Sequence, residues 1–365
     1  FLKDMLKGVG PSVALGRDTT MLREILDKTA ERVGKDLKDQ PEVEAELLAT
    51  ISSVYFDLGE WMAAEEMGRR ALSIRRKRFG NEHPAVARSL LGVATRLQMQ
   101  GKNAEAEIMH REALAMQRKL LGNGHADTAV SLLHFGNLML AKSRFSEAEA
   151  MFIECLETYR KLYGNESLDV ALSLHNLASA LDAKGKSTEA ETMYRESLEI
   201  RRKLSGNEQP EVARTLNNLA DLLPPDEKEA MLREALAIRR KVLGSEHPDL
   251  CLTLHHLAAV LQVQGKLAEA ESLQREGLAM TRKLKGNEHL DVATSLKNLA
   301  TIFESQEKLA EAETMSREAL AIQRKLLGNE HSDVARALHS LAIVLAKQGK
   351  LAEAEALFRK ALAMQ

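Results

Sequence analysis

The side chains of this sequence that could do chemistry are histidines, cysteines, glutamate pairs and asparagines. Eleven histidines are present, and His255 and His256 are adjacent. On a helix, adjacent side chains point about 100° apart, so these two imidazoles cannot hold one metal ion together. No His-Glu-x-x-His segment occurs, so the sequence predicts neither a metal site nor a cofactor. Five further histidines share one loop position, which predicts helix capping: His83, His125, His247, His289 and His331.

The cysteines and glutamates do not predict catalysis. Cys155 and Cys251 both fall in predicted helices, where a cysteine is typically a small buried hydrophobic residue. Pairs such as Glu269 and Glu271 recur in most copies of a repeat, which is typical of helix starts rather than of a catalytic dyad. The sequence therefore predicts that this chain is not an enzyme.

The elements that position these residues follow a repeat. A tetrad similar to Gly-Asn-Glu-His recurs every 42 residues, except for one interval of 38. A period of this length indicates a solenoid, in which each copy packs on the next. The tetrads begin at Gly80, Gly122, Gly164, Gly206, Gly244, Gly286 and Gly328.

Each period predicts two helices. Between Pro84 and Leu97, apolar residues recur with the spacing of one helix face, and Gly101 interrupts the pattern. Asn103 is a suitable N-cap for a second helix, which ends in basic residues before Gly122. The chain is therefore predicted to be all-α, a solenoid of helix-turn-helix repeats.

Eight such repeats are predicted over residues 41–365. The fifth, 210–244, is four residues short, because Pro224 and Pro225 replace the usual turn. Residues 1–40 form a leader, whose amphipathic helix after Asp18 is expected to cap the first repeat. We interpret the sequence as a piece of a longer polypeptide.

Residues 41–365 resemble a tetratricopeptide repeat array. The segments that carry the resemblance are Leu174-His175-Asn176-Leu177-Ala178, then Gly185-Lys186 and Glu189-Ala190-Glu191. The long period and the linker at His83-Pro84 are similar to the kinesin light chain type, and the near-identical repeats look bacterial. Residues 1–40 resemble segments that join bacterial Ser/Thr protein kinases, or signalling NTPases, to such arrays. The resemblance implies a right-handed superhelical solenoid.

The resemblance also implies a concave groove lined by the first helix of each repeat. Asn176, Asn218 and Asn298 match asparagines that hold a peptide backbone in the kinesin light chain family. Basic neighbours would favour acidic peptides. A simpler interpretation is that these polar side chains only solvate a helix face or join neighbouring repeats. The residues assigned to the groove or its edge are Arg88, His134, His175, Asn176, Arg214, Asn217, Asn218, His255, His256, Lys297, Asn298, Arg336 and His339.

The predicted function is a non-catalytic protein–protein interaction scaffold that binds a peptide or partner segment in the groove of repeats 4 to 8. Groove imidazoles would gain charge below pH about 6.5 and strengthen the binding of acidic ligands. The alternative is a regulatory or sensory appendage of a larger signalling enzyme, such as a protein kinase, that self-associates. Its C-terminal edge would then form a homo-oligomer through the apolar residues Leu357, Phe358, Ala361 and Leu362.

Charge and hydropathy limit the kinds of partner that this chain is expected to bind. With 51 Lys and Arg against 53 Asp and Glu, the net charge of −2 argues against nucleic acid. Basic runs such as Arg201-Arg202-Lys203 recur opposite acidic residues, as solvated helix ends do. No apolar run is long enough for membrane insertion. Two cysteines without a disulfide framework fit the cytoplasm, and the periplasmic part of a membrane-anchored protein is the alternative.

Overall fold

The computed structural model describes residues 20–244 and 246–364, and every regular element in these residues is an α-helix. The all-α solenoid prediction is confirmed. The chain divides into two compact units, Phe1–Asn207 and Glu208–Gln365, here called unit 1 and unit 2. Each unit is described by itself.

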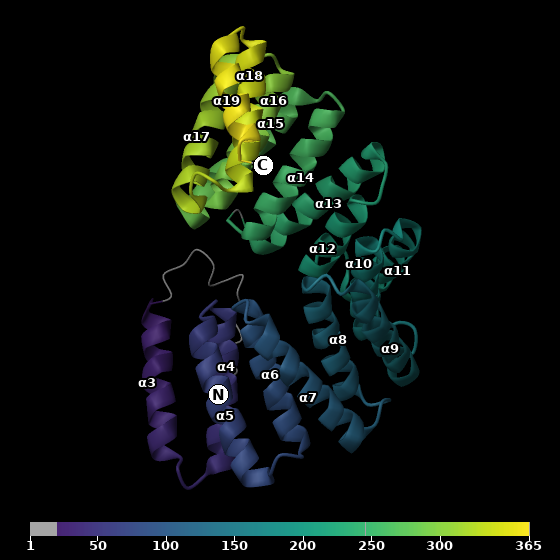
Figure 1. Cartoon of the computed structure of the whole chain (residues 1–365). Coiled ribbons are helices and arrows are strands. Elements are labelled where there is room, and N and C mark those ends of the chain that lie inside the picture. Colours follow the sequence, from purple (N-terminus) through teal and green to yellow (C-terminus); the bar gives the residue numbers. More distant parts are fainter. Residues whose placement is uncertain (1–19, 245, 365) are drawn as a thin grey trace. The chain divides into compact units, whose positions relative to one another are not determined.

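The described part of unit 1 consists of one helix followed by four helix pairs, in which each helix packs against the next along the chain (Figure 1). Helix α3 packs on α4, against the apolar core of the first pair. The helices are α3 (Thr20–Asp36), α4 (Pro41–Asp57), α5 (Trp61–Phe79), α6 (Pro84–Met99), α7 (Asn103–Leu121), α8 (Ala126–Ala141), α9 (Phe145–Tyr163), α10 (Leu168–Ala183) and α11 (Ser187–Ser205).

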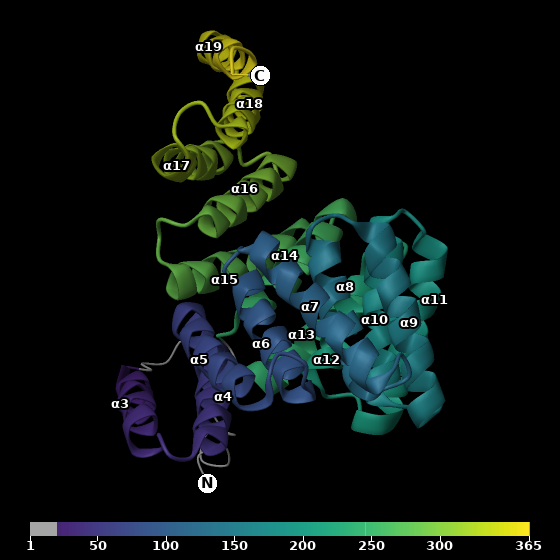
Figure 2. The same cartoon turned by 60° about the horizontal axis from the view of Figure 1, so that its bottom comes forward.

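The described part of unit 2 consists of four further helix pairs, and Figure 2 shows α16 to α19 as successive neighbours. Its first helices have 16 residues, except for α12, which has 11 because Pro224 and Pro225 start the following helix early. The helices are α12 (Pro210–Ala220), α13 (Pro225–Leu243), α14 (Pro248–Val263), α15 (Leu267–Lys285), α16 (Leu290–Ser305), α17 (Leu309–Leu327), α18 (Ser332–Lys347) and α19 (Leu351–Leu362).

The loop histidines cap the first helices, as the sequence predicts. In each case the imidazole Nδ1 accepts a hydrogen bond from the backbone N–H two residues later. In unit 1, Nδ1 of His83 accepts from Ala85 N at 3.1 Å. The same contact is made by His125, His247, His289 and His331, at 3.1–3.2 Å.

The second helices end as expected but begin differently. Each of them except α19 ends at the tetrad glycine, for example Gly80 with φ +78° and Gly122 with φ +84°, a left-handed conformation that favours glycine. The predicted N-cap at Asn103 is wrong: Asn103 is the first residue of α7, and the preceding Lys102 makes no side-chain capping hydrogen bond. A basic residue at this position is unfavourable for the helix dipole, so it needs another explanation.

The explanation is an ion pair between neighbouring repeats. The basic residue that precedes a second helix binds a glutamate near the start of the preceding second helix, with N–O distances of 2.7–3.4 Å. These glutamates are only 10–15% exposed. These glutamates near the helix starts therefore link neighbouring repeats, a role that their position in the sequence did not predict. The pairs are Glu65–Lys102, Glu107–Arg144, Glu149–Lys186, Glu229–Lys266, Glu271–Lys308 and Glu313–Lys350.

A second set of ion pairs joins the exposed sides of successive second helices. Arg76 binds Glu112 at 2.6 Å in unit 1, and Arg240 binds Glu276 at 2.7 Å in unit 2. Because these groups are more exposed, each pair contributes less than the buried glutamates do. The basic runs at the helix ends thus face carboxylates.

Replacing Glu107 by Gln should destabilise unit 1 in a pH-dependent way. Hydrogen bonds from Lys142 and Arg144 lower the pKa of Glu107 from 4.5 to about 2. Because this pKa is depressed, the stabilisation is complete above pH 4.5 and is lost as the pH falls toward 2. We expect Glu107→Gln to lower the free energy of unfolding by about 2 kcal/mol at pH 7, measured by urea denaturation.

The matched control is Glu157→Gln, since Glu157 is exposed and forms no ion pair within the described residues. That variant removes the same charge and should change stability by less than about 0.5 kcal/mol. Equal effects of both variants at pH 7 would contradict the proposed coupling.

Candidate functional site

The first helices of unit 2 present a polar face. We call it the first-helix face and define it by Arg214, Asn218, His256, Lys297, Asn298, Arg336 and His339. Arg214, Lys297, Arg336 and His339 are exposed, and the other three are half-buried. All seven were assigned to the groove or its edge from the sequence.

Two predicted groove residues of unit 2 bind other helices instead. Asn217 is 3% exposed, and its amide bonds the His256 imidazole at 3.2 Å and the Thr253 hydroxyl at 3.4 Å. His255 is half-buried and bonded at both nitrogens, Nδ1 to Gln274 Oε1 and Nε2 to Ser295 Oγ, each at 3.0 Å. For these two residues the simpler interpretation holds: they join neighbouring helices.

The predicted groove residues of unit 1 differ in exposure. Arg88 is exposed, and His134 and Asn176 are half-buried. His175 is 3% exposed, because its ring packs edge-on against Tyr194 with centroids 5.3 Å apart. A bound peptide cannot reach His175 in this structure.

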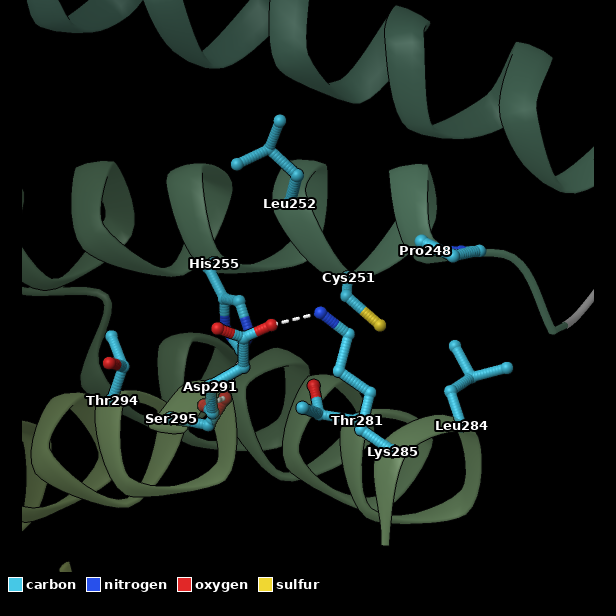
Figure 3. Close-up of a pocket in the computed structure, with 10 residues that line it drawn as sticks. All are labelled: Pro248, Cys251, Leu252, His255, Thr281, Leu284, Lys285, Asp291, Thr294 and Ser295. Atoms are coloured by element: carbon cyan, nitrogen blue, oxygen red, sulfur yellow. Dashed lines mark hydrogen bonds and ion pairs between the residues drawn. The ribbon is translucent and has the colours of Figure 1, made fainter. Parts of the chain in front are cut away.

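A cavity of about 270 Å³ lies between α14, α15 and α16 (Figure 3). Its lining includes Cys251, His255 and Thr281, and the ion pair between Lys285 and Asp291 spans it. Figure 3 shows Leu252 pointing away from these groups, on the other side of α14.

This cavity holds a cysteine and a histidine four residues apart on one helix face, but they do not form an activated pair. Burial raises the pKa of the Cys251 thiol, so the reactive thiolate is disfavoured. Both nitrogens of His255 are already bonded to Gln274 and Ser295. The arrangement therefore provides neither a nucleophile nor a base.

A second cavity, of about 360 Å³, lies where the fifth repeat is short. The turn before α13 and the C-terminal half of α14 line it, with Leu223 and Val260 as apolar walls. Val263 at its edge is 80% exposed, and Lys228 binds Asp221 across its rim at 2.8 Å. The sequence showed the deletion that creates this space, but not the cavity.

The four residues predicted to form the C-terminal edge differ in their exposure to solvent. Leu362 is 72% exposed, Leu357 and Phe358 are half-buried against the last apolar core, and Ala361 is buried in that core. Ala361 therefore contributes to the internal core of the last repeat and offers no surface to a second copy. Self-association through the other three residues stays a prediction.

Two further features concern metals and membranes. Over residues 20–244 and 246–364, no group of three or more His, Cys, Asp or Glu side chains could hold a metal ion. Within the same residues, no helix combines the length and the hydropathy needed to cross a membrane.

Comparisons with known proteins agree on the fold. A family model described as tetratricopeptide repeat matches residues 44–119, 97–161, 127–203, 169–223, 225–283, 249–325 and 291–365. A search of curated protein sequences finds no significant match. Among solved structures, BtubC (BKLC) from P. vanneervenii has a TM-score of 0.53 and 23% identity, over 60% of this chain and 90% of its own.

Two other solved structures are similar over nearly the whole chain. The apo form of the quorum sensor NprR from B. thuringiensis has a TM-score of 0.68 and 14% identity, over 100% of this chain and 99% of its own. A signal transduction ATPase with a tetratricopeptide repeat sensor, from Pyrococcus horikoshii, has a TM-score of 0.64 and 13% identity. That match covers 93% of this chain and 52% of the ATPase. At these identities the likeness shows the fold alone.

His255 and His256 should have pKa values below the usual range of histidine. Burial lowers the pKa of His255 and His256, so both rings stay neutral at a pH where a free imidazole gains charge. For these two rings, the gain of charge expected below pH about 6.5 is thus shifted to lower pH. We expect NMR titration of the imidazole nitrogens to give both midpoints below that of histidine in a short peptide.

Gln274→Ala provides an internal check. The hydrogen bond to Gln274 raises the pKa of His255 against the effect of burial. Its removal should lower the His255 midpoint further and leave that of His256 unchanged. A His255 midpoint at or above the peptide value would refute the assignment.

Proposed function

The chain belongs to the tetratricopeptide repeat family, and on this basis we propose that unit 2 is a protein-interaction module that holds an extended segment of a partner protein. The segment would lie on the first-helix face, across α12, α14, α16 and α18. The family provides the fold, while the proposal rests on the side chains of this face.

The observation that carries the proposal is a contrast in pairing. On the second helices and in the turns before them, basic residues such as Arg240 and Lys266 form ion pairs with glutamates of neighbouring repeats. On the first-helix face, the side chains of Arg214, Lys297 and Asn298 form no hydrogen bond or ion pair with the described residues of unit 2. Polar groups that the fold does not use are available to a ligand.

These groups suit a peptide with an acidic side chain. The Asn298 amide can donate to a backbone carbonyl and accept from a backbone N–H, whatever the peptide sequence. Arg214 and Lys297 would add charge-assisted hydrogen bonds to a carboxylate. The cavity beside His256, walled by Leu223 and Val260, would take one apolar side chain of the same segment.

The site differs from the groove expected from the sequence in two respects. Asn217 is left out because it is buried, and His255 because both of its nitrogens are bonded to other helices of unit 2. The cavity of the short repeat is added. Arg88, His134 and Asn176 remain candidates for a separate contact within unit 1.

Removing the polar side chains of Lys297 and Asn298 should weaken peptide binding. Short random peptides displayed on phage would be selected against the full chain, and the affinity of the enriched peptides measured by fluorescence anisotropy. We expect Lys297→Ala combined with Asn298→Ala to weaken binding about 10- to 100-fold, because it removes one charged and one neutral hydrogen-bonding group.

The control is Arg240→Gln, which removes one positive charge from a second helix of the same unit. This variant should bind the selected peptides as tightly as the unmodified chain. If no peptide is enriched, or if the enriched peptides bind the double variant unchanged, the first-helix face is not the site.

A further inference from the structure

Three arginines converge on a cavity in unit 1 that the proposed function does not use. The cavity has a volume of about 180 Å³ and lies between α4 and α6, with α5 beneath. Arg75 reaches it from α5, and Arg88 and Arg96 reach it from α6. No aspartate or glutamate is among the residues that line it.

Two of the guanidinium groups are held in place one helical turn apart. Nη1 of Arg75 donates to the Ser89 hydroxyl at 2.7 Å. Nη1 of Arg96 donates to the backbone carbonyl of Gly92 at 2.8 Å, so its side chain folds back toward Ser89. Both groups are therefore fixed beside the same stretch of α6.

Contacts with α4 also hold the Arg96 guanidinium in place. Its Nε donates to the Ser52 hydroxyl at 3.2 Å, and Ser52 in turn donates to the carbonyl of Ala64 at 2.6 Å. The guanidinium lies over the ring of Phe56, with Cζ 5.1 Å from the centroid. Nη2 of Arg96 also donates to the Ser53 hydroxyl at 3.3 Å, so the guanidinium is held in place at the cavity, which lowers the entropic cost of binding.

The positive charge in this cavity is not neutralised by an ion pair. Within the described residues of unit 1, Arg75, Arg88 and Arg96 have no carboxylate within ion-pair distance. Glu46 attracts Arg75 and Asp57 attracts Arg96 from a greater distance. Burial lowers the pKa of both arginines, and the charge of Arg88 lowers that of Arg75 further. A bound anion would relieve this repulsion.

Among the described repeats, arginines occur together at all three positions only here, since Arg201 and Arg214 repeat Arg75 and Arg88 without an equivalent of Arg96. At the position of Arg96, other repeats have the apolar residues Leu138, Ala180, Val260, Ile302 and Val344. Gly92 stands where other repeats carry a side chain, and an added Cβ would lie 3.2 Å from the Arg96 guanidinium. In an array of near-identical repeats, a charged group at an apolar position marks a local requirement.

We propose that this cavity binds a phosphate group, as inorganic phosphate or as a phosphate monoester. Guanidinium donors arriving from three side chains suit the tetrahedral oxygens of phosphate better than a planar carboxylate. The space equals that of about six water molecules, enough for a phosphate group. This site lies in unit 1 and does not depend on peptide binding in unit 2.

The test uses inorganic phosphate, titrated into the full chain by calorimetry at constant ionic strength with chloride as the reference anion. Three substitutions import the residues of the next repeat: Arg75→Gln as in Gln117, Arg88→Val as in Val130, and Arg96→Leu as in Leu138. We expect saturable binding by the unmodified chain and a loss of at least about tenfold in the triple variant. Arg118→Gln, which removes a charge paired with Glu154 outside the cavity, should bind normally.

Two further probes identify the source of the phosphate. A glycine-flanked phosphoserine peptide and its unphosphorylated twin are compared with inorganic phosphate. Binding of the phosphopeptide but not of its twin assigns the site to a phosphorylated partner segment, and binding of inorganic phosphate alone assigns it to the free anion. The proposal is overturned if acetate binds as well as phosphate, if neither phosphate probe binds, or if binding survives in a triple variant whose thermal unfolding shows it to be folded.

Discussion

The structure depends on a mostly buried glutamate, present in six of the repeats, that a cation from the turn of the following repeat helps to neutralise. Glu107 and Glu313 illustrate it: each is mostly buried, and each needs a cation from the turn of the next repeat. A buried carboxylate without that cation would be costly, so the stability of one repeat is linked to the position of its neighbour. This explains why a basic residue precedes the second helices, although the helix dipole disfavours it there.

The short fifth repeat shows how strictly this spacing is kept. Lys119 binds Glu82 in unit 1, and Lys283 binds Glu246 in unit 2, each pair 37 residues apart. In the fifth repeat the equivalent pair is Lys241 and Glu208, 33 residues apart, with the lysine 2.5 Å from the carboxylate. Helix α12 has 11 residues where α14 has 16, the turn that follows α12 is one residue longer, and the ion pair is retained. The deletion therefore opens a cavity while this exposed ion pair is kept, although Pro224 stands where the other repeats have the basic residue of the turn.

The period and the spacing of apolar residues were enough to predict the helix pairs, although the start of the second helix was misassigned at Asn103. The accessibility of a single groove residue could not be predicted in this way, since it depends on the residue that packs against it. His175 and Lys297 occupy equivalent positions, yet Tyr194 covers the first and the second is exposed. Asn217 was assigned to the groove for the same reason and is instead bonded to Thr253 and His256. The repeat period predicts the direction in which a side chain points, but it does not predict which residues pack against that side chain.

Departures from the repeat indicate where binding chemistry can arise. The space between neighbouring first helices, above a second helix, opens as a cavity at α4–α6 and again at α14–α16. Arg75 and Arg88 line the first cavity, where Thr281 and Thr294 occupy the equivalent positions in the second. The same backbone geometry thus creates a cationic site in unit 1 and a neutral one in unit 2. The repeat determines the backbone, so a few substitutions on the first and second helices are sufficient to change the charge of such a cavity.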